Sequence, residues 1–259
     1  MADGLTVERR GPVAQVTIDR QHRRNALSQD VMDGLVEIFD RCDRDDEVWL
    51  VTVTGAGDVA FSAGRDLKEL ADRDRTDAPH HEPMKGSTRN AFEAIYECRK
   101  PTIAAINGWA VGGGLEIAMA CDLRVAVAHA RLSLPESHRG MGANFGAAIL
   151  PRLVPAGIAF EMLYLGDSVT AEQAHGWGLV NRVFDAATFR ADVDDFVAQL
   201  LARAPLTLRR YKQVLHHTPT VHLSAAIRTP LVPDPYRSED RVEGVAAFVE
   251  KRTPRWVAR

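Results

Sequence analysis

Three features are scarce in this 259-residue sequence: cysteine, long apolar runs and an excess of positive charge. The three cysteines follow no spacing pattern, so they predict reduced thiols in the cytoplasm and not a disulfide framework. No apolar run reaches the roughly 20 residues of a membrane span, and the N-terminal residues lead straight into a strand pattern, so neither membrane contact nor a signal peptide is expected. Net charge is −3, which argues against non-specific nucleic-acid binding.

Apolar residues make up 46% of the chain, enough for one large domain with a substantial core. The pattern predicts a hairpin over 5–19, a helix that begins at Ser28 and a buried strand over 48–55, an order typical of a parallel crossover. A helix over 88–98, further short strands and a glycine-opened helix follow, and the polar segment 72–87 is predicted as a loop. From about Thr188 onward the sequence pattern predicts helices. We therefore expect an α/β core over 1–195 and a helical C-terminal region over 196–259.

A run of three glycines, Gly112 to Gly114, directly precedes a segment with helical character. The N-terminus of a helix exposes unpaired N–H groups and the positive end of the helix dipole, and glycine lets another molecule come close to them. The run suits an oxygen that gains negative charge during a reaction. The plain alternative is a tight strand-to-helix turn, and the residues alone favour neither. The spacing fits neither a phosphate loop nor a dinucleotide fingerprint.

A second turn of this kind lies in "VAFSAGRDLKEL", where Ala63 and Gly64 precede Arg65 and a predicted helix. Taken alone, it favours an ordinary turn. Parallel strands, however, bring such turns to the same end of a sheet. The N–H groups of the two turns can then converge on one oxygen.

Two glutamates accompany these turns. Glu116 lies just inside the glycine-opened helix among apolar neighbours, and Glu136 follows a predicted strand in "SLPESHRG". Glu136 on its own favours a role near a helix cap. Two carboxyls in one poorly solvated site cannot both ionise easily, so the pair would supply an acid and a base near neutral pH.

Six segments carry a resemblance: "RRNALS", "AFSAGRDLKEL", "AAINGWAVGGGLEIAMACDLRVA", "LPE", "AHGWGLVNRV" and "EGVAAFVEKR". In order and spacing they resemble the crotonase (enoyl-CoA hydratase/isomerase) superfamily over nearly the whole chain. They are most similar to enoyl-CoA hydratases and carnitinyl-CoA dehydratases. The resemblance implies an α/β fold with a ββα spiral core, a C-terminal helical trimerisation region, and a homotrimer or a dimer of trimers.

The resemblance also implies roles for individual residues. The backbone N–H groups of Arg65 and Gly113 would form an oxyanion hole for a thioester, and Glu116 and Glu136 would handle water. Coenzyme A would enter as part of the substrate, with no separate cofactor and no metal. Its binding residues would be Arg23, Arg24, Ala26, Leu27, Ala63, Gly64, Asp66, Leu67 and Gly112, with Phe248 and Lys251, often from a neighbouring subunit.

One segment departs from the family pattern. "RGMGANFGAAILPR" lacks the usual proline and is one residue shorter, and this loop lines the acyl pocket in relatives. His138 lies nearby, and a surface position is the favoured interpretation for it. The first hypothesis is an enoyl-CoA hydratase. The alternatives are a carnitinyl-CoA dehydratase or racemase, an isomerase, hydrolase or decarboxylase of the same fold, or a non-catalytic RNA-binding member.

Overall fold

The computed structural model describes residues 3–76, 89–228 and 234–259. One layer is a six-stranded sheet in the order β1-β2-β3-β5-β7-β10, in which β1 and β2 are antiparallel and the other neighbours are parallel. Its strands are β1 (Leu5–Arg10), β2 (Val13–Ile18), β3 (Leu50–Gly55), β5 (Thr102–Ile106), β7 (Leu123–Val127) and β10 (Arg182–Phe184). The predicted hairpin and the parallel crossover are therefore confirmed.

A second, four-stranded sheet has the order β4-β6-β8-β9. Its strands are β4 (Ala60–Ser62), β6 (Trp109–Val111), β8 (Arg131–Ser133) and β9 (Val169–Thr170), and β4, β6 and β8 run parallel. Each pass of the chain gives one strand to the first sheet and the next to the second: β3 then β4, β5 then β6, β7 then β8. This alternation is the ββα spiral that the sequence predicted.

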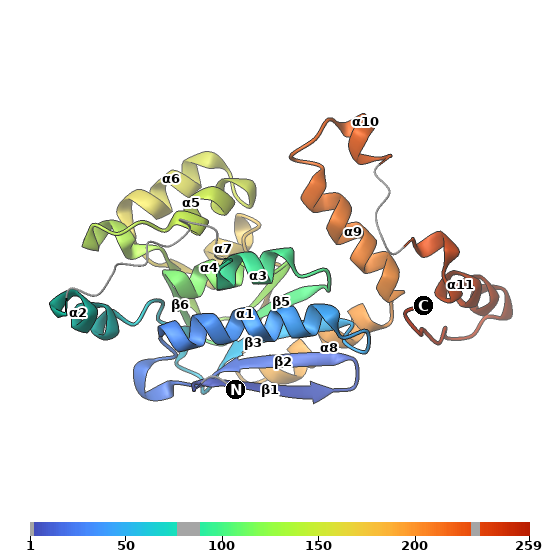
Figure 1. The fold of residues 1–259 in the computed structure, drawn as a ribbon, viewed down its shortest axis with the longest axis horizontal. Helices are drawn as coiled ribbons and strands as arrows, with labels where there is room; N and C mark the ends of the chain where they lie inside the picture. Colours follow the sequence, from blue (N-terminus) through green and yellow to red (C-terminus); the bar gives the residue numbers. More distant parts are fainter. Residues whose placement is uncertain (1–2, 77–88, 229–233) are drawn as a thin grey trace.

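Helix α1 (Gln29–Arg44) shows why these segments fold as they do. Ser28 caps it by accepting a hydrogen bond from the Val31 amide, and several of its apolar side chains, Leu35 and Phe39 among them, are fully buried. In Figure 1 this helix lies along the first sheet, with α3 (Ala91–Glu97) beside it. Both helices contribute to the main hydrophobic core, which also takes in α4 (Gly113–Ala120).

The remaining helices surround this core. They are α2 (Leu67–Arg75), α5 (Asn144–Ile149), α6 (Ala156–Leu165), α7 (Ala171–Gly176), α8 (Phe189–Leu201), α9 (Pro205–His217), α10 (Leu223–Ala226) and α11 (Glu239–Glu250). Short 3-10 turns are η1 (Gln21–Arg23), η2 (Pro135–Arg139), η3 (Leu150–Arg152) and η4 (Pro235–Arg237). None of the helices in the described part of the chain is long and apolar enough to cross a membrane.

The predicted loop over 72–87 is wrong in its first part, because α2 continues to Arg75. This helix buries none of its side chains and begins at Asp66, whose carboxylate accepts from the amides of Lys68 and Glu69. Its polar sequence gave no apolar period, so the cap was its main signal. The rest of the predicted loop, and the predicted helix start at 88, lie outside the described residues.

The C-terminal helices α9 to α11 extend to one side of the core (Figure 1). Lys212 on α9 makes a largely buried ion pair of 2.9 Å with Asp122, which fastens this helix to the end of α4. Helix α8 crosses the domain boundary placed at 195, and its side chains on both sides of that position, such as Val193 and Val197, pack against the first sheet. The division into 1–195 and 196–259 stays a prediction.

Candidate active site

The two motifs "RRNAL" and "AGRD" lie side by side. The Ala63 amide donates to the Arg24 carbonyl at 3.0 Å, and the Leu27 amide donates to the Gly64 carbonyl at 2.8 Å. The Asp66 amide in turn donates to the Leu27 carbonyl at 3.0 Å. Six of the predicted binding residues are thus consecutive or hydrogen-bonded neighbours: Arg23, Arg24, Leu27, Ala63, Gly64 and Asp66.

The Arg65 amide faces the start of α4. Leu27 and Arg65 form a parallel β-bridge, in which Leu27 bonds to the Gly64 carbonyl and to the Asp66 amide. Because these two groups face Leu27, the N–H of Arg65 between them points to the opposite side of the strand. A Cβ atom added to Gly113 would lie 3.8 Å from the Arg65 nitrogen, and one added to Gly64 would lie 3.2 Å from the Gly113 nitrogen. The structure therefore brings the two predicted amides together.

Glycine is required at this junction for steric reasons. Gly64 has φ +79, and a Cβ there would lie 2.5 Å from the Val111 carbonyl oxygen. Gly112 has φ +53, and a Cβ there would lie 2.6 Å from Oε1 of Glu136. The Gly113 amide belongs to the first turn of α4, where N–H groups have no partner within the helix. The glycine run therefore shapes a tight turn and leaves an open donor.

Glu116 projects from the first turn of α4 into the interior and is 6% exposed. Burial raises its pKa to about 7; the amide of Gly146 lowers that pKa by donating to Oε1 at 2.7 Å, and the charge of Glu136 raises it. At neutral pH this carboxyl is therefore divided between its protonated and ionised forms. Such a group can give or take a proton with little cost.

Glu136 lies on η2, directly after β8. Its Oε1 atom lies against Gly112. The carbonyl of Gly112 also accepts a hydrogen bond from the Glu116 amide at 3.0 Å. The segments that carry the two carboxyls therefore meet at Gly112. Oε2 of Glu136 is buried and has no hydrogen-bond partner. Burial raises the pKa of Glu136, against the opposing effect of the Arg139 charge. A buried carboxyl oxygen without a partner is suited to a water or a substrate group.

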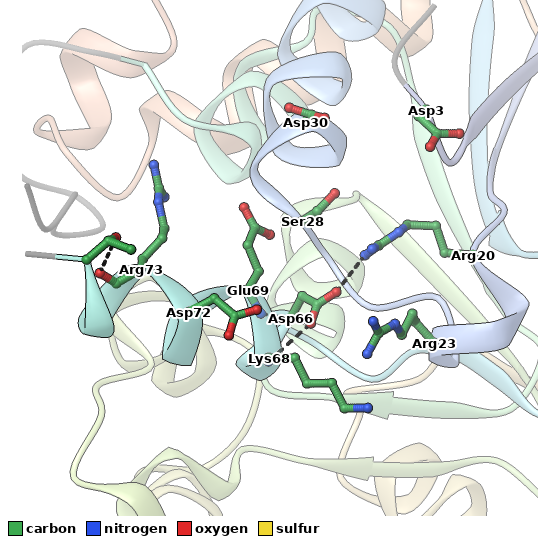
Figure 2. Close-up of a pocket in the computed structure, with 11 residues that line it drawn as sticks. Asp3, Arg20, Arg23, Ser28, Asp30, Asp66, Lys68, Glu69, Asp72 and Arg73 are labelled. Atoms are coloured by element: carbon green, nitrogen blue, oxygen red, sulfur yellow. Dashed lines mark hydrogen bonds and ion pairs between the residues drawn. The ribbon is translucent and has the colours of Figure 1, made fainter. Parts of the chain in front are cut away.

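A charged cavity of about 530 Å³ lies next to this junction, between α2, η1 and the start of α1. Figure 2 shows Arg20 pointing at Asp66, with which it pairs at 3.1 Å, while Arg23 and Lys68 extend from η1 and from α2. Burial would raise the pKa of Asp66, but amide hydrogen bonds and the Arg20 guanidinium keep it below its ordinary value. Asp66 is therefore an ionised structural carboxylate paired with Arg20. The other cations of the lining are Arg23, Lys68 and Arg73, and its other acids are Asp3, Asp30, Glu69 and Asp72.

Other predicted binding residues have different surroundings. Ala26 is buried, and Leu67 at the start of α2 is 41% exposed. Phe248 and Lys251 lie on and just after α11, at the end of the molecule opposite α2 (Figure 1). Within one chain they are not brought to the site.

Sequence reasoning missed three contributors. Lys68 and Arg20 line the cavity. Lys68 belongs to the motif "AFSAGRDLKEL", but only other residues of that motif were predicted to bind. The third is the Gly146 amide, which holds Glu116 from the first turns of α5. No local pattern in "GMGANFGAAIL" could have shown which amide reaches a residue 30 positions away. In the described residues, no group of three or more His, Cys, Asp or Glu could hold a metal ion.

Comparison with known proteins agrees with this geometry. A family model described as enoyl-CoA hydratase/isomerase matches residues 8–259. Carnitinyl-CoA dehydratases of Salmonella typhi and Citrobacter koseri are each 35% identical over 266 residues, covering 100% of both chains.

Solved structures are similar over the same extent. An enoyl-CoA hydratase from Mycobacterium tuberculosis has a TM-score of 0.88 with 32% identity, covering 99% of each chain. An enoyl-CoA hydratase from Bacillus anthracis also has a TM-score of 0.88, with 29% identity, covering 99% of this chain and 100% of that one. The ββα spiral, the two glycine turns and the full-length matches together establish that this chain belongs to the enoyl-CoA hydratase/isomerase family, the crotonase superfamily.

Proposed function

We propose that the protein is an enoyl-CoA hydratase, a hydro-lyase that reversibly adds water to a 2-enoyl-CoA thioester. The observation that carries the proposal is the pair of carboxyls that meet at Gly112. Glu116 is buried, and Glu136 is half-buried, with its Oε2 atom buried and left without a partner. Isomerisation of a double bond moves one proton between two carbons, which a single carboxyl can do. Addition of water does, because one proton must leave the water and another must reach the α-carbon.

The chemistry follows from the geometry. The thioester oxygen binds the N–H groups of Arg65 and Gly113, which stabilise the charge that develops when water attacks the β-carbon. One carboxylate takes a proton from the attacking water, and the other carboxyl gives a proton to the α-carbon. The net result is the addition of one water across the double bond. The two glutamates end with their protonation states exchanged, so the proton taken from water passes between them or through solvent before the next turnover. The reverse sequence dehydrates a 3-hydroxyacyl-CoA. Either glutamate fits either role.

The charged cavity supports a place for coenzyme A. Arg23 and Lys68 suit its phosphates, and Ala26, Leu27 and Asp66 form the adjoining wall. The proposed reaction needs only the attack of water and proton transfers on a thioester, so coenzyme A is needed only as part of the substrate. The three cysteines are free thiols, in keeping with a cytoplasmic location.

We also propose a homotrimer or a dimer of trimers. Apolar side chains are exposed on α11, where Phe248 is 85% exposed, and on α6, where Phe160 and Tyr164 are exposed. Two unlike surfaces that join head to tail form a ring when the rotation between subunits closes, as we propose here. In such a ring, Phe248 and Lys251 of one subunit can approach the coenzyme A site of the next.

The test is hydration of crotonyl-CoA by the purified protein and by two variants, Glu116→Gln and Glu136→Gln. Loss of one acid–base group should lower kcat by about 100- to 10,000-fold. The exposed Glu172→Gln is the matched control and should keep the wild-type rate. If both site variants hydrate crotonyl-CoA as fast as the wild type, the proposal is wrong.

A carnitinyl-CoA dehydratase is the second candidate, favoured by the 35% identity of relatives with that name over their full length. Such an enzyme also removes water from an acyl-CoA, but from a different acyl group. The ratio of kcat/KM for carnitinyl-CoA and for 3-hydroxybutyryl-CoA decides between the two. A ratio well above one assigns the dehydratase.

A further inference from the structure

The 3-10 turn η2, which carries Glu136, has little of its own to hold it in place. None of its five residues is buried, and residues 137–140 are exposed. The amides of Gly140 and Met141 both donate to the Glu136 carbonyl, which fixes the shape of the turn. These bonds are internal, and a short 3-10 turn is a weak structure. They do not fix the position of the turn relative to α4.

His138 connects this turn to a neighbouring helix. Its Nε2 lies 2.5 Å from the carbonyl oxygen of Leu165, the last residue of α6. A carbonyl oxygen only accepts, so Nε2 must carry the hydrogen. The last carbonyls of a helix have no partner within it, so this bond satisfies one of them. Helix α6 is itself anchored by the buried Ala159 and Met162.

The turn also fits closely between two glycines. Gly166 caps α6 in the left-handed conformation, and a Cβ there would lie 2.9 Å from Cα of Pro135 and 3.1 Å from Nε2 of His138. On the other side, Oε1 of Glu136 abuts Gly112 at the start of α4. The turn is therefore seated between the end of α6 and the start of α4, and His138 joins it to α6.

We propose that His138 is a positioning residue: by donating to the Leu165 carbonyl, it holds η2 against α6 and thereby keeps the Glu136 carboxyl over Gly112. The proposal rests on the proposed function, in which Glu136 exchanges a proton with water or substrate. His138 does not touch the reacting atoms. It lies on the protein surface, as the sequence interpretation favoured, and acts from there through the backbone of the turn.

The first readout is kinetic. His138→Leu removes the donor, His138→Gln keeps an N–H donor at a similar reach, and Ser137→Ala is the control on the same turn. With crotonyl-CoA as substrate, His138→Leu should lower kcat about 10- to 100-fold and change KM less than threefold, since a misplaced acid–base group slows chemistry and not binding. His138→Gln should recover most of kcat, and Ser137→Ala should match the wild type.

The second readout does not depend on activity. Hydrogen exchange at the amides of Gly140 and Met141 should be about tenfold faster in His138→Leu, with protection restored in His138→Gln. The amide of Val125 in the central sheet is the internal control and should not change. Gly166→Ala, which pushes on the same turn from α6, should also speed exchange at these two amides.

The two readouts separate the proposals. If the wild type hydrates no enoyl-CoA but His138→Leu loses protection at Gly140 and Met141, the proposed function fails and the positioning role stands. If His138→Leu keeps wild-type protection at both amides, the positioning role is wrong. Equal loss in the Leu and Gln variants would also overturn it, because the hydrogen-bond donor would then not be the cause.

Discussion

At the scale of single residues, Glu116 decides how the site behaves near neutral pH. Its carboxyl is buried on a helix whose other side chains are apolar, and the Gly146 amide is a donor to it. The backbone hydrogen bonds from Gly146 and Phe145 do not compensate for lost hydration, so the ionised form is disfavoured and the pKa rises to about 7. A residue useful for proton transfer is for the same reason a burden on stability.

This burden predicts a pH-dependent gain for Glu116→Gln. The folded-state pKa of about 7 exceeds the ordinary 4.5, so the favourable effect of protonation is present below pH 4.5 and lost as pH rises through 7. The variant lacks this loss. At pH 8 its free energy of unfolding should exceed that of the wild type by on the order of 3 kcal/mol, and by much less at pH 5.

Urea denaturation at both pH values measures the difference. The exposed Glu172→Gln should stay within about 0.5 kcal/mol of the wild type at each pH. A gain for Glu116→Gln that is the same at pH 5 and pH 8 would contradict the burial of an ionising carboxyl.

Residue-level prediction from the sequence succeeded where a turn imposes geometry. Two glycine turns after parallel strands must place their amides at one end of a sheet, and Arg65 and Gly113 do lie close together. The roles assigned to them stay predictions. The Gly146 contact and the His138 bond could not be foreseen, because each depends on how α5 or α6 packs in three dimensions.

At the scale of elements, helix α4 is closed at its far end by a buried arginine. Arg124 is 4% exposed, and its guanidinium donates to the carbonyls of Ala118, Cys121, Asp122 and Leu179. Burial lowers the pKa of this guanidinium. The four carbonyls include the last ones of α4, which the helix itself leaves without partners. The helix that carries Glu116 thus has its C-terminal end fixed to the sheet.

Replacement of this residue by Arg124→Leu should destabilise the protein. Several buried carbonyls would lose their donor, at about 1–3 kcal/mol for each group left without one. We expect a loss of at least about 3 kcal/mol in the free energy of unfolding, measured by thermal or urea denaturation. Arg182→Leu, at an exposed position, should change it by less than about 0.5 kcal/mol. Equal, small effects of both variants would show that the network carries little stability.

Elements with a strong cap or a long apolar period were predictable: the hairpin and α1 were both confirmed. Strands β4, β6 and β9 have only two or three residues each, too few to show an alternating pattern. They form because neighbouring segments already hold them in register. This explains why the second sheet was not predicted strand by strand.

At the scale of the whole molecule, the exposed apolar surfaces on α6 and α11 predict self-association. Light scattering after size-exclusion chromatography should give a mass of three or six times the chain mass of 28.5 kDa. Phe248→Asp should shift the protein to monomers and raise KM for the acyl-CoA. Val59→Asp, at another exposed apolar position, should leave the mass unchanged. A Phe248→Asp protein that stays assembled would place the interface elsewhere.

The convergence of the Arg65 and Gly113 N–H groups has a consequence for how this enzyme can be redesigned. Every amino acid except proline carries the same main-chain donor, so only a change to proline at position 65 deletes it. The acids at 116 and 136, in contrast, are each one substitution away from an amide or a hydroxyl. A directed-evolution library confined to these two positions would therefore vary the proton transfers proposed for the thioester, while the main-chain donors proposed for its oxygen stay unchanged.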